Sequence, residues 1–157
     1  MFTKAQVLST DFIIATGFFI LSIVVLYYFW NYSYVQLEEV RRANEISNAA
    51  YVISSIWFRE GVPEYWNTSN VIEIGLQNNH RFNQTKLDYL NDLGYYNVKE
   101  MLGYPIYDFY LRIYDMQNNT FFDFGEIPTE DVKNIEKIER IGIMNSTVVY
   151  VETLVWR

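Results

Sequence analysis

The sequence predicts an α+β protein in which a long N-terminal transmembrane helix continues into a helix that packs on a C-terminal, largely antiparallel, four-stranded sheet. Three observations predict this class. An uncharged apolar run covers residues 12–30, helical spacing of apolar residues continues to Trp57, and the pattern changes to alternation from Tyr107. The expected organisation is a short cytoplasmic N-terminus over 1–11, a transmembrane helix over 12–30, an extracytoplasmic continuation of the helix over 31–60 and an extracytoplasmic α+β domain over 61–157.

The run from Phe12 to Trp30 reads FIIATGFFILSIVVLYYFW and contains no charged residue. Its nineteen residues form about 28 Å of α-helix, close to the roughly 30 Å hydrocarbon thickness of a bilayer. The aromatic residues at its C-terminal end, from Tyr27 to Trp30, are typical of a membrane–water interface. A secretory signal peptide has a shorter apolar core and a small-residue cleavage site behind it. The alternative is a buried helix of a soluble protein.

The orientation of this helix is not decided by basic residues, because Lys4 precedes it and Arg41 and Arg42 follow it. Five Asn-x-Ser/Thr sequons favour an extracytoplasmic C-terminal part, where they would accept glycans. Asn31 lies too near the bilayer to count among them. The candidate glycosylation sites are therefore Asn67, Asn83, Asn118 and Asn145.

Charge and cysteine content narrow the class of partner. The chain carries twelve Lys and Arg against nineteen Asp and Glu, a net charge of −7. Lys4 and Asp11 cancel, so this whole net charge lies after the apolar run. An acidic surface disfavours nucleic acid and anionic lipid as partners, and simple solubility also explains it. The absence of cysteine excludes disulfides, thiolate metal sites and a cysteine nucleophile.

Residues 34–57 continue the helix with one apolar stripe, which Gly61 and Pro63 end. The following residues predict a brief strand at 71–76 and two short helices at 85–93 and 97–102, the second ending at Gly103. Two hairpins complete the chain. Their strands are expected at 107–114 and 120–124, and at 135–143 and 147–156.

Aromatic residues are expected to fill the core between the helix and the sheet. The residues expected to point inward are Trp57, Phe109, Phe122, Tyr150 and Trp156. Tyr110 and Tyr114 fall on the opposite face of their strand from Phe109. They are therefore candidates for contact with a second subunit or another partner.

A long N-terminal helix, half in the membrane and half packed on an antiparallel sheet, resembles the type IV pilin architecture. Lys4, Ala5, Gln6, Ser9, Asp11 and Phe12, just before the apolar run, resemble the class III signal peptide of archaeal type IV pilin-like proteins. This resemblance implies cleavage between Ala5 and Gln6 by a prepilin-type peptidase. The chain differs from the usual family pattern because Ala5 replaces glycine and Asp11 would be the sixth mature residue instead of the fifth.

The middle of the chain is similar to a pattern in uncharacterised archaeal surface proteins with pilin-like starts. The residues that carry it are Pro63, Trp66, Asn67, Ser69, Asn70, Val71, Ile74, Gly75, Leu76, Lys86, Leu87, Lys99, Leu102, Gly103, Tyr107, Asp108 and Phe109. This similarity implies kinship and no known activity.

Asp11 has two interpretations. A carboxylate at the membrane end of an apolar helix costs about 2–3 kcal/mol near the bilayer centre, and the N-terminal ammonium of a neighbouring subunit would offset that cost. In an assembly, Asp11 would then set the axial register of the subunits. Alternatively, Asp11 lies at the headgroup boundary or caps the first helical turn.

No motif in the sequence predicts enzymatic chemistry. His80 is the only histidine and lies in an expected loop without a nucleophile nearby. Four residues around the first hairpin turn, Asp115, Asn118, Asn119 and Asp123, offer oxygen ligands for calcium, but turn formation explains them better. We therefore expect no enzyme activity, no catalytic residue, no cofactor and no metal site.

The sequence predicts a structural protein: a pilin-like subunit, anchored by its N-terminal helix, that assembles into a pilus, a pseudopilus or a cell-envelope complex. Its expected partners are membrane lipid and further copies of itself or other pilin-like subunits. The small residues Ala15, Gly17 and Ser22 would allow close helix packing. The alternative is an uncleaved single-pass membrane protein whose extracytoplasmic domain binds a ligand or a protein partner.

Overall fold

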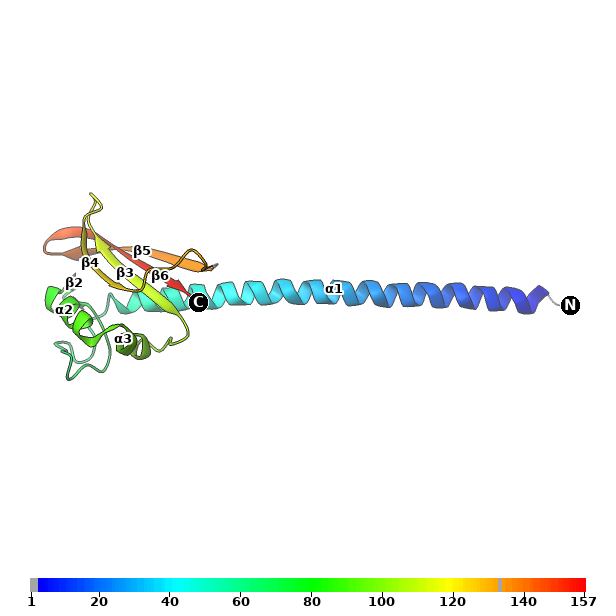
Figure 1. Ribbon diagram of the computed structural model, residues 1–157, viewed down its shortest axis with the longest axis horizontal. Coiled ribbons are helices and arrows are strands. Elements are labelled where there is room, and N and C mark those ends of the chain that lie inside the picture. The colour runs from blue at the N-terminus through cyan, green and yellow to red at the C-terminus, as the bar shows by residue number, and fades with distance from the viewer. Residues whose placement is uncertain (1–2, 133) are drawn as a thin grey trace. The chain divides into compact units, whose positions relative to one another are not determined.

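The computed structural model describes residues 3–132 and 134–157, with side chains from Thr10 onward. The chain divides into two compact units, Met1–Arg42 and Ala43–Arg157. Helix α1 (Thr3–Ile56) extends through both units. Its residues up to Arg42 belong to the first unit, and its last turns, from Ala43 to Ile56, belong to the second. The fold is α+β, with a long apolar N-terminal helix and a six-stranded mixed sheet (Figure 1).

The part of α1 that belongs to the second unit carries the apolar stripe that the sequence predicts. Ile46, Ala49, Ala50 and Ile53 recur at helical spacing and are nearly fully buried in the core cluster. The helix ends at Ile56, earlier than the expected residue 60. A tight turn follows, and the chain then reverses through Gly61 and Pro63, where Gly61 has a φ of +79° that favours glycine.

The sheet has the strand order β1-β2-β5-β6-β3-β4. Four long strands correspond to the two expected hairpins and pair antiparallel with one another: β3 (Asp108–Tyr114), β4 (Thr120–Gly125), β5 (Ile135–Met144) and β6 (Thr147–Trp156). Residues Asn145 and Ser146 connect β5 to β6 with φ values of +50° and +65°. Two consecutive positive φ values are those of the type I′ turn, which matches the twist of a hairpin.

Two short strands make the sheet larger than the expected four strands. These are β1 (Gln77–Asn78) and β2 (Arg81–Phe82), joined by a turn at Asn79 and His80 with positive φ at both residues. β2 lies parallel to β5, which makes the sheet mixed. The prediction of a strand at 71–76 is wrong, because that segment makes only one isolated β-bridge, between Glu73 and Val62.

Along the sequence, two short helices follow the β1–β2 hairpin and precede the long strands. Helix α2 (Gln84–Leu93) begins one residue before its expected start, and the side chain of Asn83 caps it by accepting from the Thr85 N–H at 2.9 Å. Helix α3 (Tyr95–Met101) begins directly after Gly94, whose φ of +77° separates the two helices. Both expected helices are therefore present with slightly different ends.

The core lies between the sheet, the last turns of α1, and helices α2 and α3. Trp57, Phe109 and Phe122 are buried there as expected, and the rings of Trp57 and Phe109 lie 5.8 Å apart. The expectation for Tyr150 is wrong, because it is half-buried on the opposite face of β6 from Val149 and Val151. Trp156 is buried but falls on that same opposite face, since strand side chains alternate.

Candidate functional site

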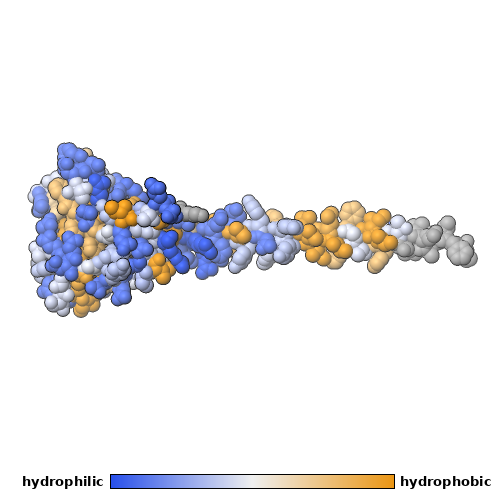
Figure 2. All heavy atoms as spheres, viewed as in Figure 1, coloured by the Kyte–Doolittle hydropathy of each residue, from blue (hydrophilic) through white to orange (hydrophobic). Residues whose placement is uncertain are grey.

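The first part of the candidate site is the apolar surface of α1. Its large apolar side chains from Phe12 to Trp30 are between 44 % and 76 % exposed. Within the described residues, Thr10–Ile56 is the one helix segment long and apolar enough to cross a membrane, and its most apolar window is uncovered by the rest of the chain. Figure 2 shows this stretch as the orange part of the helix. Such a surface requires lipid or other helices to cover it.

The small residues of this helix do not all lie on one face. At about 100° per residue, Ala15 and Ser22 face nearly the same direction and Asp11 lies beside them, whereas Gly17 points to the opposite side. The Ser22 hydroxyl donates to the Phe18 carbonyl at 2.8 Å and is thereby satisfied within the helix. Asp11, Ala15 and Ser22 therefore form one narrow seam, and Gly17 is a separate point of close approach.

Asp11 is the ninth residue of α1, and its side chain is exposed. Helix α1 begins at Thr3, so Asp11 lies beyond the first turn, where a cap would have to be. The capping interpretation is therefore wrong for this chain. The predicted cleavage site, Ala5 and Gln6, lies in the part of α1 whose side chains are outside the described residues.

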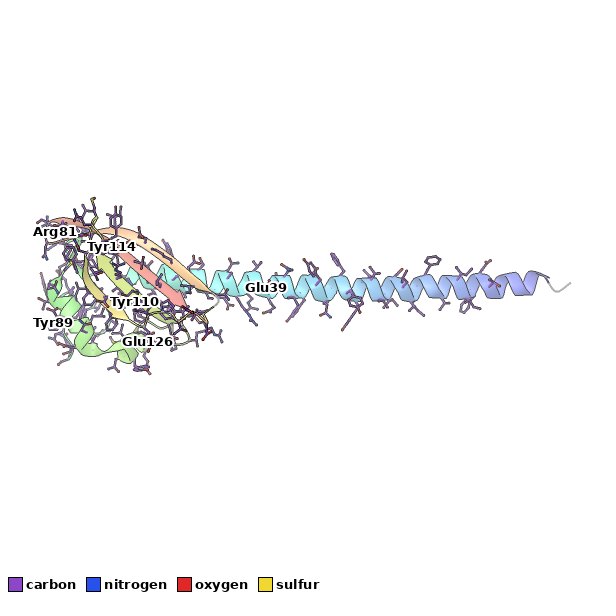
Figure 3. The ribbon with its side chains drawn as sticks, turned by 45° about the horizontal axis from the view of Figure 1, so that its top comes forward. Glu39, Arg81, Tyr89, Tyr110, Tyr114 and Glu126 are labelled. Atoms are coloured by element: carbon purple, nitrogen blue, oxygen red, sulfur yellow. The ribbon has the colours of Figure 1, made fainter. Side chains whose placement is uncertain are left out.

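The second part of the candidate site is the face of the sheet opposite the core of the second unit, called here the outer face. Tyr110 and Tyr114 lie on it, half-buried, and Figure 3 labels both on β3. The ring of Tyr114 stacks on Tyr150 of β6 with 5.6 Å between ring centroids, and the Arg112 guanidinium lies 4.7 Å from the Tyr114 ring centroid. Neither tyrosine is fully buried, so a contact role for the two stays a prediction.

Charged groups hold this aromatic face in place. The Tyr114 hydroxyl donates to Glu139 at 2.9 Å, and Lys137 pairs with both Glu139 and Glu152. The hydrogen bond to Glu152 is the largest contribution that raises the pKa of Lys137. Burial, followed by the hydrogen bond to Glu139, raises the pKa of Tyr114. Lys137 and Tyr114 therefore keep their protons at neutral pH. The aromatic rings of the outer face lie beside the ion pairs of Lys137 with Glu139 and Glu152.

A second polar cluster lies where β3 begins. Asp108 pairs with Lys99 of α3 and accepts from the Tyr95 hydroxyl at 2.9 Å. Burial is the largest single contribution and raises the pKa of Asp108, but the hydrogen bonds from Lys99 and Tyr95 and the charge of Lys99 together outweigh it. The pKa of Asp108 is therefore lower than its ordinary value. This cluster joins α3 to the sheet and was not visible in the sequence, because its members come from separate elements.

Three of the four residues considered as calcium ligands are engaged in the hairpin turn. Asp115 accepts from the backbone N–H groups of Gln117 and Asn119 at 2.8 and 2.9 Å, and also from the Asn119 side chain. These bonds, led by the one from the Asn119 side chain, lower the pKa of Asp115. The side-chain oxygen of Asn118 accepts from Arg112 at 3.1 Å. Asp115, Asn118 and Asn119 therefore act as turn residues, whereas Asp123 is exposed within β4. His80 is exposed in the turn before β2.

The four candidate glycosylation sites differ in what their side chains do. Asn145 and Asn118 are exposed at hairpin turns. Asn67 and Asn83 are half-buried and accept hydrogen bonds from the backbone two residues further on. Asn145 and Asn118 are therefore more accessible than Asn67 and Asn83.

Comparison of the chain with protein families, with curated proteins and with solved structures finds no match.

Proposed function

We propose that the chain is a pilin-like structural subunit of the archaeal type, anchored by α1, which assembles into a pilus, a pseudopilus or a cell-envelope complex. The observation that carries this proposal is the exposed apolar stretch from Phe12 to Trp30, which continues without a break into the helix of a folded domain. A membrane alone covers that stretch in a monomer, and neighbouring helices cover it in a filament. The same surface therefore serves both states.

Assembly would proceed through helix-on-helix packing along the seam of Asp11, Ala15 and Ser22. Small residues let two helix backbones approach closely, and an acidic residue at the end of the seam selects the position at which a neighbouring ammonium meets it. Gly17 would serve a contact on the other side of the helix. Two different contact faces are what an open, helical assembly needs, because each subunit must bind a neighbour on either side.

The proposed topology places the N-terminus in the cytoplasm and the C-terminal domain outside the cell, in a single-pass arrangement. The four sequons and the acidic domain support this topology. The domain would then be a possible glycoprotein surface, and a prepilin-type peptidase would act at Ala5 and Gln6. No nucleic acid is expected as a partner.

The alternative function is an uncleaved single-pass membrane protein whose outer domain binds a ligand or a protein partner. The aromatic outer face of the sheet favours it, because Tyr110, Tyr114 and Tyr150 are side chains typical of contact surfaces. The state of the N-terminus separates the two functions.

The first experiment is the mass of the N-terminal peptide of the protein isolated from native membranes. A chain beginning at Gln6 supports processing and assembly. A chain beginning at Met1 or Phe2 contradicts the pilin-like proposal and favours the permanent anchor.

The second experiment compares Asp11→Ala with Thr16→Ala in crosslinking and filament assays. Asp11→Ala should abolish assembly and leave membrane insertion intact. Thr16 is a matched control, because its hydroxyl is already bonded to the Phe12 carbonyl at 2.8 Å and faces another side of the helix. Assembly of Asp11→Ala at the wild-type level would contradict the role of Asp11.

A further inference from the structure

A cavity of about 260 Å³ lies beside the N-terminus of α2, within the second unit. Its walls come from the loop after α1, from β1 and from the first turns of α2. The volume is slightly below the roughly 300–1,000 Å³ of common small-molecule sites. A ligand of one ring therefore matches it better than an extended chain does.

Aromatic rings form one side of the cavity. Tyr65 is 73 % exposed at its rim, and Tyr89 of α2 is half-buried in its wall and labelled in Figure 3. Trp66 lies behind them with its ring 6.0 Å from that of Tyr89, and its indole N–H donates to the buried Gly75 carbonyl at 2.7 Å. Trp66 is thereby fixed, and the two tyrosines offer ring faces on a rigid support.

Polar groups form the other side. Asn83 and Asn78 bind each other at 3.1 Å, which orients both amides. Thr85 is exposed, and its hydroxyl has no hydrogen-bond partner among the described residues. The side-chain oxygen of Asn67 accepts from Ser69, which leaves its NH₂ group for a ligand. The cavity thus offers a ligand the Thr85 hydroxyl and the Asn67 NH₂ group together with the ring faces of the two tyrosines.

The charge around the cavity disfavours anionic ligands. Lys86 is its buried cation, 2 % exposed, and its ammonium already donates to the carbonyl groups of Glu60 and Gln77. The carboxylates of Glu60 and Glu64 act on Lys86, and the whole chain is acidic. A phosphate or a carboxylate would therefore enter a region of negative potential.

We propose that this cavity binds one neutral pyranose ring of a saccharide. The apolar C–H face of a sugar would lie against Tyr65 and Tyr89, and its hydroxyl groups would bond to Thr85 and Asn67. This arrangement covers apolar and polar surface of the ligand at once, as small-molecule sites do. The inference uses only the second unit and goes beyond the proposed anchoring role of α1.

The sugar has two possible sources, because Asn67 and Asn83 line the cavity and are also sequon residues. A glycan on either residue would bring its own first ring to the cavity. A saccharide from another surface would instead enter from solvent. In both cases the rings of Tyr65 and Tyr89 and the Thr85 hydroxyl would recognise the sugar, whereas the Asn67 NH₂ group would do so only when Asn67 itself carries no glycan.

The first test uses the full chain made in bacteria that lack N-glycosylation, in a detergent without a sugar headgroup. Methyl glycosides of glucose, galactose, mannose and N-acetylglucosamine are titrated while the indole N–H resonance of Trp66 is followed. Trp66→Phe assigns that resonance among the four tryptophans. We expect a saturable shift with a Kd of about 1–10 mM for at least one glycoside. No saturable shift at about 100 mM for any of them would overturn the proposal.

Variants show whether a shift comes from the cavity. Tyr65→Ala should weaken binding at least about tenfold, whereas the control Tyr96→Ala should not, since Tyr65 and Tyr96 are 73 % and 75 % exposed and neither contributes to the buried core. Thr85→Val should weaken binding and Thr85→Ser should retain it. Equal binding by Tyr65→Ala and the control would overturn the proposal.

A second test identifies the source of the sugar. Mass spectrometry of the chain from native membranes shows whether the peptides with Asn67 and Asn83 carry glycans, and the same titration shows whether the native chain still binds the glycosides. Modified peptides and lost binding assign the cavity to the chain's own glycan. Unmodified peptides and retained binding assign it to an external saccharide. Unmodified peptides without binding would contradict the proposal.

Discussion

Two buried tryptophans provide a sharp test of the second unit. Trp66 and Trp57 are 1 % and 0 % exposed, so replacement of either by phenylalanine removes a similar amount of buried ring. Their indole N–H groups differ. The N–H of Trp66 donates to the Gly75 carbonyl at 2.7 Å, whereas the N–H of Trp57 has no acceptor among the described residues.

The expected magnitude follows from this difference. Trp66→Phe leaves the buried Gly75 carbonyl without its donor, which costs about 1–3 kcal/mol beyond the lost packing. Trp57→Phe removes a buried donor without a partner, which offsets its packing loss by a similar amount. Packing losses largely cancel between the two. We therefore expect Trp66→Phe to be less stable than Trp57→Phe by about 2–6 kcal/mol.

The assay is thermal and urea unfolding of the full chain in detergent, followed by near-ultraviolet circular dichroism. For a chain of this size the difference corresponds to a Tm separation of roughly 10 °C. Far-ultraviolet spectra of both variants below the transition serve as the folding control. Equal midpoints, or a lower midpoint for Trp57→Phe, would refute the reasoning from hydrogen bonding.

Three further outcomes are expected. Gly75→Ala should destabilise the second unit by about 3 kcal/mol or more, because the new Cβ would meet backbone atoms at 2.3 and 2.5 Å. In the control Gly17→Ala, the new Cβ meets nothing within 4 Å, so the urea midpoint of the chain should not change. Asp108, which pairs with Lys99, has a lower pKa in the folded chain than its value of 3.8 in the unfolded chain. The ionised carboxylate therefore stabilises the fold at pH values above 3.8, and this stabilisation is lost as the pH falls through the folded pKa. Urea midpoints measured across this acid range should therefore fall less for Asp108→Asn than for wild type. Finally, Asn145→Gln should lower the intact mass of the native protein by one glycan, and an unchanged mass would show that this site is unoccupied.

The long elements could be predicted because their signals are local. Helix α1, the short helices α2 and α3, and the strands β3 to β6 each show an apolar spacing over about two turns or more, or over several alternations. The strands β1 and β2 contain two residues each, which is too short for any alternation to appear. Their hairpin depends on positive φ values at Asn79 and His80, and histidine is not a usual signal of such a turn.

The inward and outward positions of aromatic residues were harder to predict near the ends of β6. Tyr150 lies outward because the register with β3 places it opposite Tyr114. A change of one residue in register moves a side chain to the other face, and the sequence does not contain the register. The contact pairs of the outer face, including Lys137 with Glu152, could not be assigned for the same reason.

The sequence by itself determined the length and uncharged character of the Phe12–Trp30 helix, because transfer into a membrane depends on composition along one continuous segment. Only the tertiary structure decided which groups meet away from that helix. Tyr65, Asn78 and Thr85 surround one cavity although they come from different segments, and Asp108 of β3 meets Lys99 of α3. Such meetings depend on chain reversals at Gly61 and Gly94 and on strand register, which no local pattern of residues specifies.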